Sequence, residues 1–117
     1  MYEIILFEKG NGDKPAEEFL NSLDKKMRTK MVKVIEKLAD NGPKLGRPHS
    51  AYLRDGILEL RAQSGSNITR VLYFFIEGKT VVLTHGFIKK TQEIPPNEIE
   101  KAKKYRDEYR ENRRNLL

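Results

Sequence analysis

Arginine, lysine and histidine side chains recur in the middle of the chain, and four of them could act on a phosphodiester: Arg61, Arg70, His85 and Lys89. RNA can be cut without a metal ion when its own 2′-hydroxyl attacks the neighbouring phosphate. One group must then take the hydroxyl proton, another must protonate the leaving oxygen, and cations must stabilise the phosphoryl charge. Arginine offers a fork of donors that matches phosphate oxygens, and histidine transfers protons near neutral pH. These residue types therefore favour phosphodiester chemistry.

Three further residues are candidates for binding a nucleic acid. Lys90 and Arg54 would add positive charge, and Phe87 offers a ring on which an unpaired base could stack, an interaction of about 1 to 3 kcal/mol. Lys89 and Lys90 also have a structural interpretation, because lysines beside a strand discourage pairing at a sheet edge.

The other candidates have structural interpretations too. Glu59 is expected to form a cross-strand ion pair with Arg61 or Arg70 rather than to act as a catalyst. A single histidine in a strand is more often packed or hydrogen-bonded than catalytic, which leaves both roles open for His85. His49, in a loop beside a proline, is the weaker candidate of the two histidines.

Four β-type segments are expected to carry these residues. Short apolar runs bounded by turn residues predict strands over 2–7, 57–62, 68–76 and 80–88. The two short links between the last three contain glycine and have the length of hairpin loops. The sequence therefore predicts a three-stranded antiparallel meander, preceded by one separate strand.

Three helices are expected around these strands. The first begins at Asp13 and Pro15, with the aspartate as its cap. The second begins at Asp24 and ends at Asn41-Gly42-Pro43, and it buries one stripe: Met27, Met31, Val34, Ile35 and Leu38. The third begins after Pro95-Pro96 and carries one narrow stripe of apolar and aromatic residues, in which the two tyrosines are expected to pack: Ile99, Ala102, Tyr105 and Tyr109.

The expected fold is a single α+β domain over residues 1–117, in the order strand, helix, helix, meander, helix. The two early helices should cover one face of the sheet and leave the other partly open. Strand alternation would place the chemically interesting side chains together on the less covered face. These are Glu59, Arg61, Arg70, His85, Phe87 and Lys89.

Composition narrows the classes of protein. The chain carries 23 Lys and Arg against 17 Asp and Glu, and the excess is concentrated in residues 43–90, which suggests attraction to polyanions. With no cysteine and two histidines, thiolate catalysis and cysteine or histidine metal sites are excluded. No cofactor is expected. The N-terminus lacks the pattern of a signal peptide and no membrane span is expected, so the interpretation is a cytoplasmic protein.

Three segments together resemble a known family. They are Leu53-Arg54-Asp55-Gly56-Ile57-Leu58-Glu59-Leu60-Arg61, Thr69-Arg70-Val71-Leu72-Tyr73-Phe74-Phe75 and His85-Gly86-Phe87-Ile88-Lys89-Lys90-Thr91. Their order and spacing are similar to the phage-derived, HigB-like branch of the RelE toxin superfamily. The resemblance spans nearly the whole chain, as far as the Pro-x-x-Glu-Ile helix start.

The resemblance implies the toxin of a type II toxin–antitoxin system, an endoribonuclease that degrades messenger RNA on the ribosome. It also implies a cognate antitoxin with a helix-turn-helix. By position, Arg61 and Arg70 match the family's phosphate-facing arginines, and Lys89 with Lys90 match the basic end of its last strand. Phe87 stands where many relatives place a tyrosine, so His85 or a lysine is left as the acid or base. The alternative is a non-catalytic nucleic-acid or protein-binding regulator of phage origin.

Overall fold

Five strands form one mixed sheet in a computed structural model that describes residues 1–89 and 93–116. The strands are β1 (Glu3–Leu6), β2 (Ser50–Arg54), β3 (Ile57–Ser64), β4 (Asn67–Ile76) and β5 (Thr80–Lys89). Their spatial order is β1-β5-β4-β3-β2. Strands β2 to β5 are antiparallel to their neighbours, whereas β1 pairs in parallel with β5.

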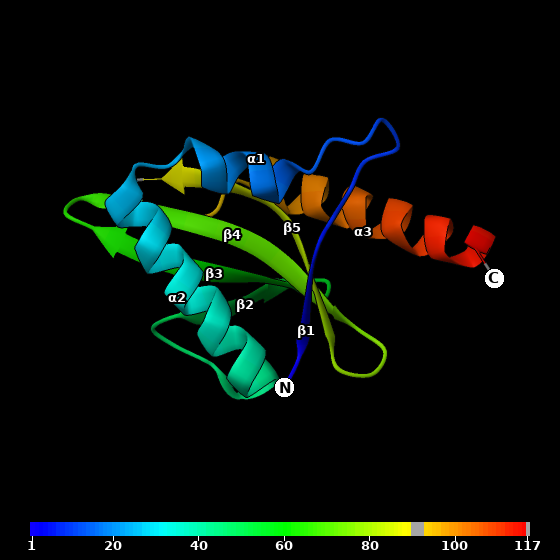
Figure 1. Cartoon of the computed structure of the whole chain (residues 1–117), viewed down its shortest axis with the longest axis horizontal. Coiled ribbons are helices and arrows are strands. Elements are labelled where there is room, and N and C mark those ends of the chain that lie inside the picture. The colour runs from blue at the N-terminus through cyan, green and yellow to red at the C-terminus, as the bar shows by residue number, and fades with distance from the viewer. Residues whose placement is uncertain (90–92, 117) are drawn as a thin grey trace.

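Helices lie on both faces of this sheet. Helices α1 (Pro15–Ser22) and α2 (Lys25–Asn41) lie in front of it in Figure 1, and α3 (Pro96–Leu116) passes behind it. A short 3-10 turn, η1 (Gly42–Lys44), follows α2. No helix in the described part of the chain is long and apolar enough to cross a membrane.

The ends of α2 follow the local signals in the sequence. The Asp24 carboxylate accepts a hydrogen bond from the Met27 amide at 2.8 Å, so it caps the free N–H groups of the first turn. Gly42 ends the helix with a φ of 56°, which is unfavourable for any other residue type. Both expected ends are therefore confirmed. The expected cap of α1 is wrong, because Lys14 occupies that position and makes no capping side-chain bond.

Two apolar cores hold the layers together. Under α1 and α2 the sheet buries Leu60, Ala62, Val71, Tyr73, Val81 and Leu83. Under α3 it buries Ile57, Leu72, Phe74 and Val82, together with Phe7 from the segment after β1. Each large apolar side chain buried in this way contributes about 1.5 to 3 kcal/mol. The second face, which was expected to be partly open, is thus largely covered by α3.

The predicted stripe of α3 accounts for that cover. Ile99 and Ala102 are buried against the sheet, and the Tyr105 ring stacks on Phe7 with centroids 4.8 Å apart. Tyr109 meets Phe74 edge to face. The packing role expected for both tyrosines is therefore confirmed.

The strand count differs from the expected meander because the antiparallel part has four strands. Strand β2 was missed in the region read as a loop. It joins β3 through Asp55 and Gly56, whose φ angles are 53° and 84°. Two positive φ values are what a tight two-residue hairpin turn requires, and Asp-Gly is a strong signal for it.

Helix α3 is fastened to this turn by charged side chains. Lys103 Nζ donates to Asp55 Oδ2 at 3.0 Å, and Arg54 Nη2 donates to Glu100 Oε2 at 2.9 Å. Arg106 also donates to the Asp55 carbonyl. The Lys103 ammonium lowers the pKa of Asp55. These contacts are exposed, so they orient α3 more than they stabilise it.

The Gly86 position tests the packing of α1 on β5. A Cβ at Gly86 would overlap the Phe19 ring and lie 2.9 Å from the Arg70 carbonyl oxygen. We expect Gly86→Ala to lower the free energy of unfolding by about 1 to 3 kcal/mol through overpacking, measured by urea denaturation. Gly10→Ala is the matched control, since a Cβ there meets nothing within 4 Å. Equal stability of the two variants would contradict this packing.

Candidate active site

Strand register brings most of the expected residues onto the face that α3 covers. Arg61 pairs across β3 and β4 with Arg70, and Arg70 pairs across β4 and β5 with Phe87. In the next row, Leu72 pairs with both Glu59 and His85. Directly paired residues point to the same side of a sheet. The expected common face is therefore confirmed, while Lys90 lies outside the described residues.

An ion-pair cluster occupies the centre of this face. Glu59 is 3% exposed, accepts a hydrogen bond from Arg70, which is 0% exposed, and forms an ion pair with Arg61 Nε at 2.9 Å. Burial raises the pKa of Glu59, against the opposing effect of the two guanidinium groups. The ion pair expected for Glu59 is therefore present with both arginines. Arg70 has no surface with which to touch a substrate, whereas the Arg61 side chain is 20% exposed.

His85 is sealed between the sheet and α3. It is 5% exposed, and its Nε2 lies 3.3 Å from Glu98 Oε1 while its Nδ1 lies 3.2 Å from Thr84 Oγ1. The Tyr105 ring packs edge-on against it at 5.8 Å between centroids. Burial lowers the pKa of His85, against the effect of the Glu98 carboxylate. These contacts support the packed, hydrogen-bonded interpretation of this histidine.

Two of the remaining expected residues share the sheet face of the cluster, and Arg54 lies apart from it. Phe87 and Lys89 are half-buried on β5, and Lys89 pairs with Ile68 on β4. Lys89 lies two strands across and two residues along from Arg61, which corresponds to about 12 Å. Arg54 is exposed at the far end of β2, where its guanidinium pairs with Glu100 of α3. The structure therefore does not bring Arg54 to the ion-pair cluster.

A cavity of about 380 Å³ opens onto the cluster between β2, β3 and α3. Its charged lining consists of Arg47, Glu59 and Arg61. The positive charge of Arg47 also acts to lower the pKa of Glu59. Arg47 was missed in the sequence because it lies in the Gly- and Pro-rich loop before β2, where no alternation reveals the direction of a side chain.

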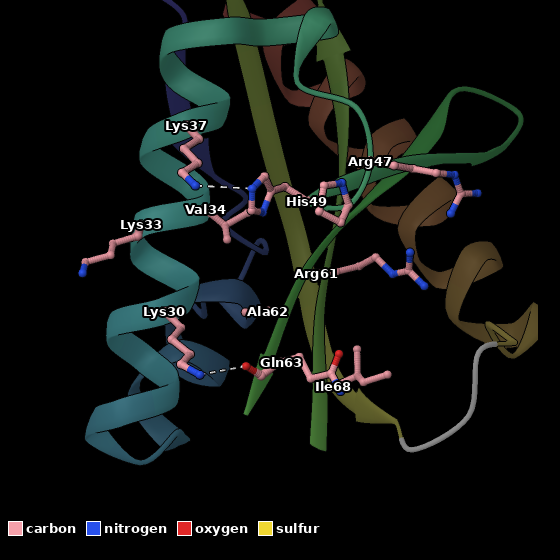
Figure 2. Close-up of a pocket in the computed structure, with 11 residues that line it drawn as sticks. Lys30, Lys33, Val34, Lys37, Arg47, His49, Arg61, Ala62, Gln63 and Ile68 are labelled. Carbon is pink, nitrogen blue, oxygen red and sulfur yellow. Dashed lines mark hydrogen bonds between the residues drawn. The ribbon is translucent and has the colours of Figure 1, made fainter. Parts of the chain in front are cut away.

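A second hollow, which we call the basic groove, lies between α2 and the edge of β3 and has a volume of about 620 Å³. It is lined by Lys30, Lys33, Val34, Lys37, Arg47, Pro48, His49, Arg61, Ala62, Gln63 and Ile68 (Figure 2). No carboxylate is among these lining residues. Arg47 and Arg61 line both hollows, so they mark the junction between them.

Contacts across the basic groove fix two of its lysines. Lys30 Nζ donates to the Gln63 carbonyl at 3.0 Å, and Lys37 Nζ lies 3.3 Å from His49 Nε2. An ammonium group has no acceptor, so Lys37 must be the donor and His49 Nε2 must carry its lone pair. Figure 2 shows both contacts, with the Arg47 and Arg61 guanidinium groups pointing away from α2.

In the described ranges, no three His, Asp or Glu side chains come together in a way that could hold a metal ion.

The buried ion pair predicts a stability effect. Glu59→Gln removes the negative charge that compensates Arg70, and leaving a buried charge without its partner costs about 3 to 5 kcal/mol. We expect this loss in the free energy of unfolding measured by denaturant titration. Replacing both residues together, as Glu59→Leu with Arg70→Leu, should recover most of the loss. A single variant as stable as the wild type would contradict the charged pair.

His85 predicts a dependence of stability on pH. Its pKa is lowered in the folded protein, so the unfolded chain takes up this proton first as the pH falls below the ordinary value of 6.5. The stability contributed by neutral His85 is therefore present above that pH and is lost below it, with a slope of up to about 1.4 kcal/mol per pH unit. His85→Gln should flatten this part of the profile in thermal unfolding from about pH 7 to 5. An unchanged profile would show that His85 does not titrate in this way.

Comparison with known proteins assigns the chain to a family. No curated protein matches it. The model of one family, described as phage derived protein Gp49-like (DUF891), matches residues 18–107. That range contains α2, all four antiparallel strands, the ion-pair cluster and the first half of α3. The phage-derived part of the expected resemblance is thereby confirmed, and the chain belongs to the phage-derived Gp49-like family.

Proposed function

We propose that this protein is the toxin of a type II toxin–antitoxin system and cuts messenger RNA on the ribosome, in the cytoplasm, without a metal ion. One observation carries the proposal: two accessible arginines, Arg47 and Arg61, flank a cavity whose wall holds the carboxylate of Glu59. Membership of a phage-derived family is compatible with a toxin. The RelE- and HigB-like sequence segments support the same assignment.

The chemistry follows from these three groups. Arg61 and Arg47 hold the phosphate and stabilise the charge that develops on its oxygens. Glu59 is almost fully buried but, unlike Arg70 and His85, lines the cavity wall. There this carboxylate, whose pKa is raised by burial, takes the proton of the 2′-hydroxyl as the hydroxyl oxygen attacks phosphorus. The bond from phosphorus to the 5′-oxygen breaks, and that oxygen takes a proton from water. The products are a 2′,3′-cyclic phosphate and a 5′-hydroxyl end.

Arg70 has a different part in this proposal from the one expected from sequence. It is fully buried and contacts the Glu59 carboxylate from beneath. It therefore acts as a positioning residue that holds Glu59 and, through it, Arg61. Lys89, on the same face of the sheet, adds positive charge near the path of the RNA. His85 serves to pack α3.

The proposed partner is a small helix-turn-helix antitoxin encoded beside this protein. An acidic or amphipathic segment of it would be attracted to the positive charge at the cavity. Co-expression of the neighbouring small protein should relieve growth arrest.

A non-catalytic RNA-binding regulator is the second candidate. The burial of His85 and Arg70 favours it, because it removes two of the groups first considered for catalysis. This candidate predicts that the protein binds RNA and leaves the strand intact.

Arg61 gives the direct test. Arg61→Ala should slow cleavage of messenger RNA in a purified translation reaction by about 100- to 1,000-fold, because one preorganised donor is lost. Arg61→Lys should restore only part of the rate, since lysine keeps the charge but loses the fork of donors. Cleavage is measured by mapping RNA ends, and thermal unfolding checks the fold.

Arg114→Ala is the matched control, because it removes the same charge from an exposed position at the end of α3. Wild-type cleavage by Arg61→Ala at unchanged stability would refute the assignment. Binding of RNA by the wild type without any cut would favour the regulator instead.

A further inference from the structure

The positive charges on α2 are placed where they lower the stability of the helix. The helix carries six basic and two acidic side chains, and none of the acids lies in its first turn. Basic residues in a first turn oppose the helix dipole by about 0.3 to 1 kcal/mol each. Like charges three or four positions apart, as at Lys30, Lys33 and Lys37, cost about 0.2 to 0.5 kcal/mol per pair. A charge pattern with this cost indicates a role other than helix stability.

The folded chain places two lysines of this row at the basic groove, which Arg61 lines from the other side. Lys30 and Lys37 reach from α2 toward Gln63 and His49, while Arg61 lies on the β3 side of the basic groove (Figure 2). Lys30 and Lys37 are two helical turns apart, about 10 Å along the axis. Lys33 points away from the groove in Figure 2 and adds charge at its outer rim.

The charge on the α2 side of the groove is not compensated locally. Among the described residues, no carboxylate lies within ion-pair distance of Lys30, Lys33 or Lys37. The groove floor is formed by the small or branched side chains of Val34, Ala62 and Ile68, which are almost fully buried. The lining contains no Phe, Tyr or Trp ring on which a base could stack, and the ring of His49 is engaged by Lys37. Such a surface matches a chain of phosphates and provides neither base recognition nor the apolar anchors of a protein interface.

We infer that the basic groove binds the phosphate backbone of single-stranded RNA beside the cavity at Arg61, through Lys30, Lys37 and the rim charge of Lys33. The inference rests on the proposed function for the identity of the strand. Because Arg47 and Arg61 line both hollows, a strand lying in the groove would lead its next phosphate into the cavity beside Glu59. Binding in the groove is independent of base sequence, so any sequence preference must arise elsewhere.

The test measures binding separately from cleavage. The probe is a short single-stranded 2′-O-methyl RNA, which lacks the free 2′-hydroxyl needed for cutting. Its affinity for the full chain is followed by fluorescence anisotropy between about 50 and 200 mM salt. The test variant is Lys30→Gln with Lys37→Gln, since glutamine keeps a hydrogen-bond donor and loses the charge. Its matched control is Lys25→Gln with Lys79→Gln, at exposed positions outside the groove.

The test variant should bind more weakly than the wild type. The salt slope of its binding constant should fall in magnitude by about 1.4, which corresponds to two lost phosphate contacts on a single strand. The control should keep the wild-type slope. Equal losses in both variants, an unchanged test variant, or no binding by the wild type would each overturn the inference. Poly-glutamate, which stands for an acidic protein segment, is the second probe. A test variant that binds poly-glutamate more weakly but binds RNA as the wild type does would also overturn the inference, since the groove would then be a protein-binding site.

The two proposals fail in different ways. If the wild type cuts RNA and the test variant binds it normally, the groove inference is wrong and the proposed function stands. If the test variant loses RNA binding while the wild type never cuts, the groove inference holds and the nuclease assignment is wrong.

Discussion

The buried contact between Glu59 and Arg70 is the constraint around which the rest of the sheet is organised. Two opposite charges have been removed from water between β3 and β4, and each is tolerated only because the other is present. Glu59 also forms an ion pair with Arg61, so the position of this partly exposed arginine depends on a partner that is itself buried. A substitution at Glu59, Arg61 or Arg70 would therefore disturb the other two side chains.

Helix α3 determines which side chains on this face of the sheet are buried and which are accessible to solvent. Its first turns carry Ile99 and Ala102 onto the apolar part of the sheet and place Glu98 beside His85. The cavity at Arg61 opens where this cover ends, with Ile94 and Ile99 in its wall. One helix therefore determines both why His85 is buried and packed and why Arg61 is still within reach of solvent.

Periodicity in the sequence predicted the parts of the fold that repeat. The stripe of α2 and the alternation of β3 to β5 were sufficient to place Glu59, Arg61 and Arg70 on one face. The burial of each side chain was not predictable from alternation. A period of two shows on which face of the sheet a side chain lies, but it does not show what covers that face. That is why Arg70 and His85 were expected at a surface and were found buried. Strand β2 was missed although Asp55-Gly56 predicts a tight hairpin, since the strand has only five residues and directly follows a loop rich in Gly, Pro and basic residues.

The basic groove was missed for a related reason. Counting charges by segment shows residues 1–42 as neutral, with eight basic and eight acidic side chains. Lys30 and Lys37 lie on one side of α2, facing a loop and a strand edge that follow much later in the chain. Net charge along a segment averages over faces that the fold later separates. Only the packing of α2 against β3 shows that these lysines and Arg61 belong to one surface.

The shortness of β2 has a consequence for how copies of this chain behave toward one another. Strand β2 pairs with β3 only as far as Leu60, and the Arg61 amide donates to the His49 carbonyl, so residues 62–64 extend beyond β2 at the sheet edge, and such edges invite pairing with another molecule. Here Lys30 already occupies the Gln63 carbonyl. A second copy approaching edge to edge would bring its own lysines and arginines against these. Repulsion between the two identical, positively charged surfaces therefore disfavours pairing of two copies of the chain at this edge. A negatively charged molecule is not repelled there, so the edge is still open to it.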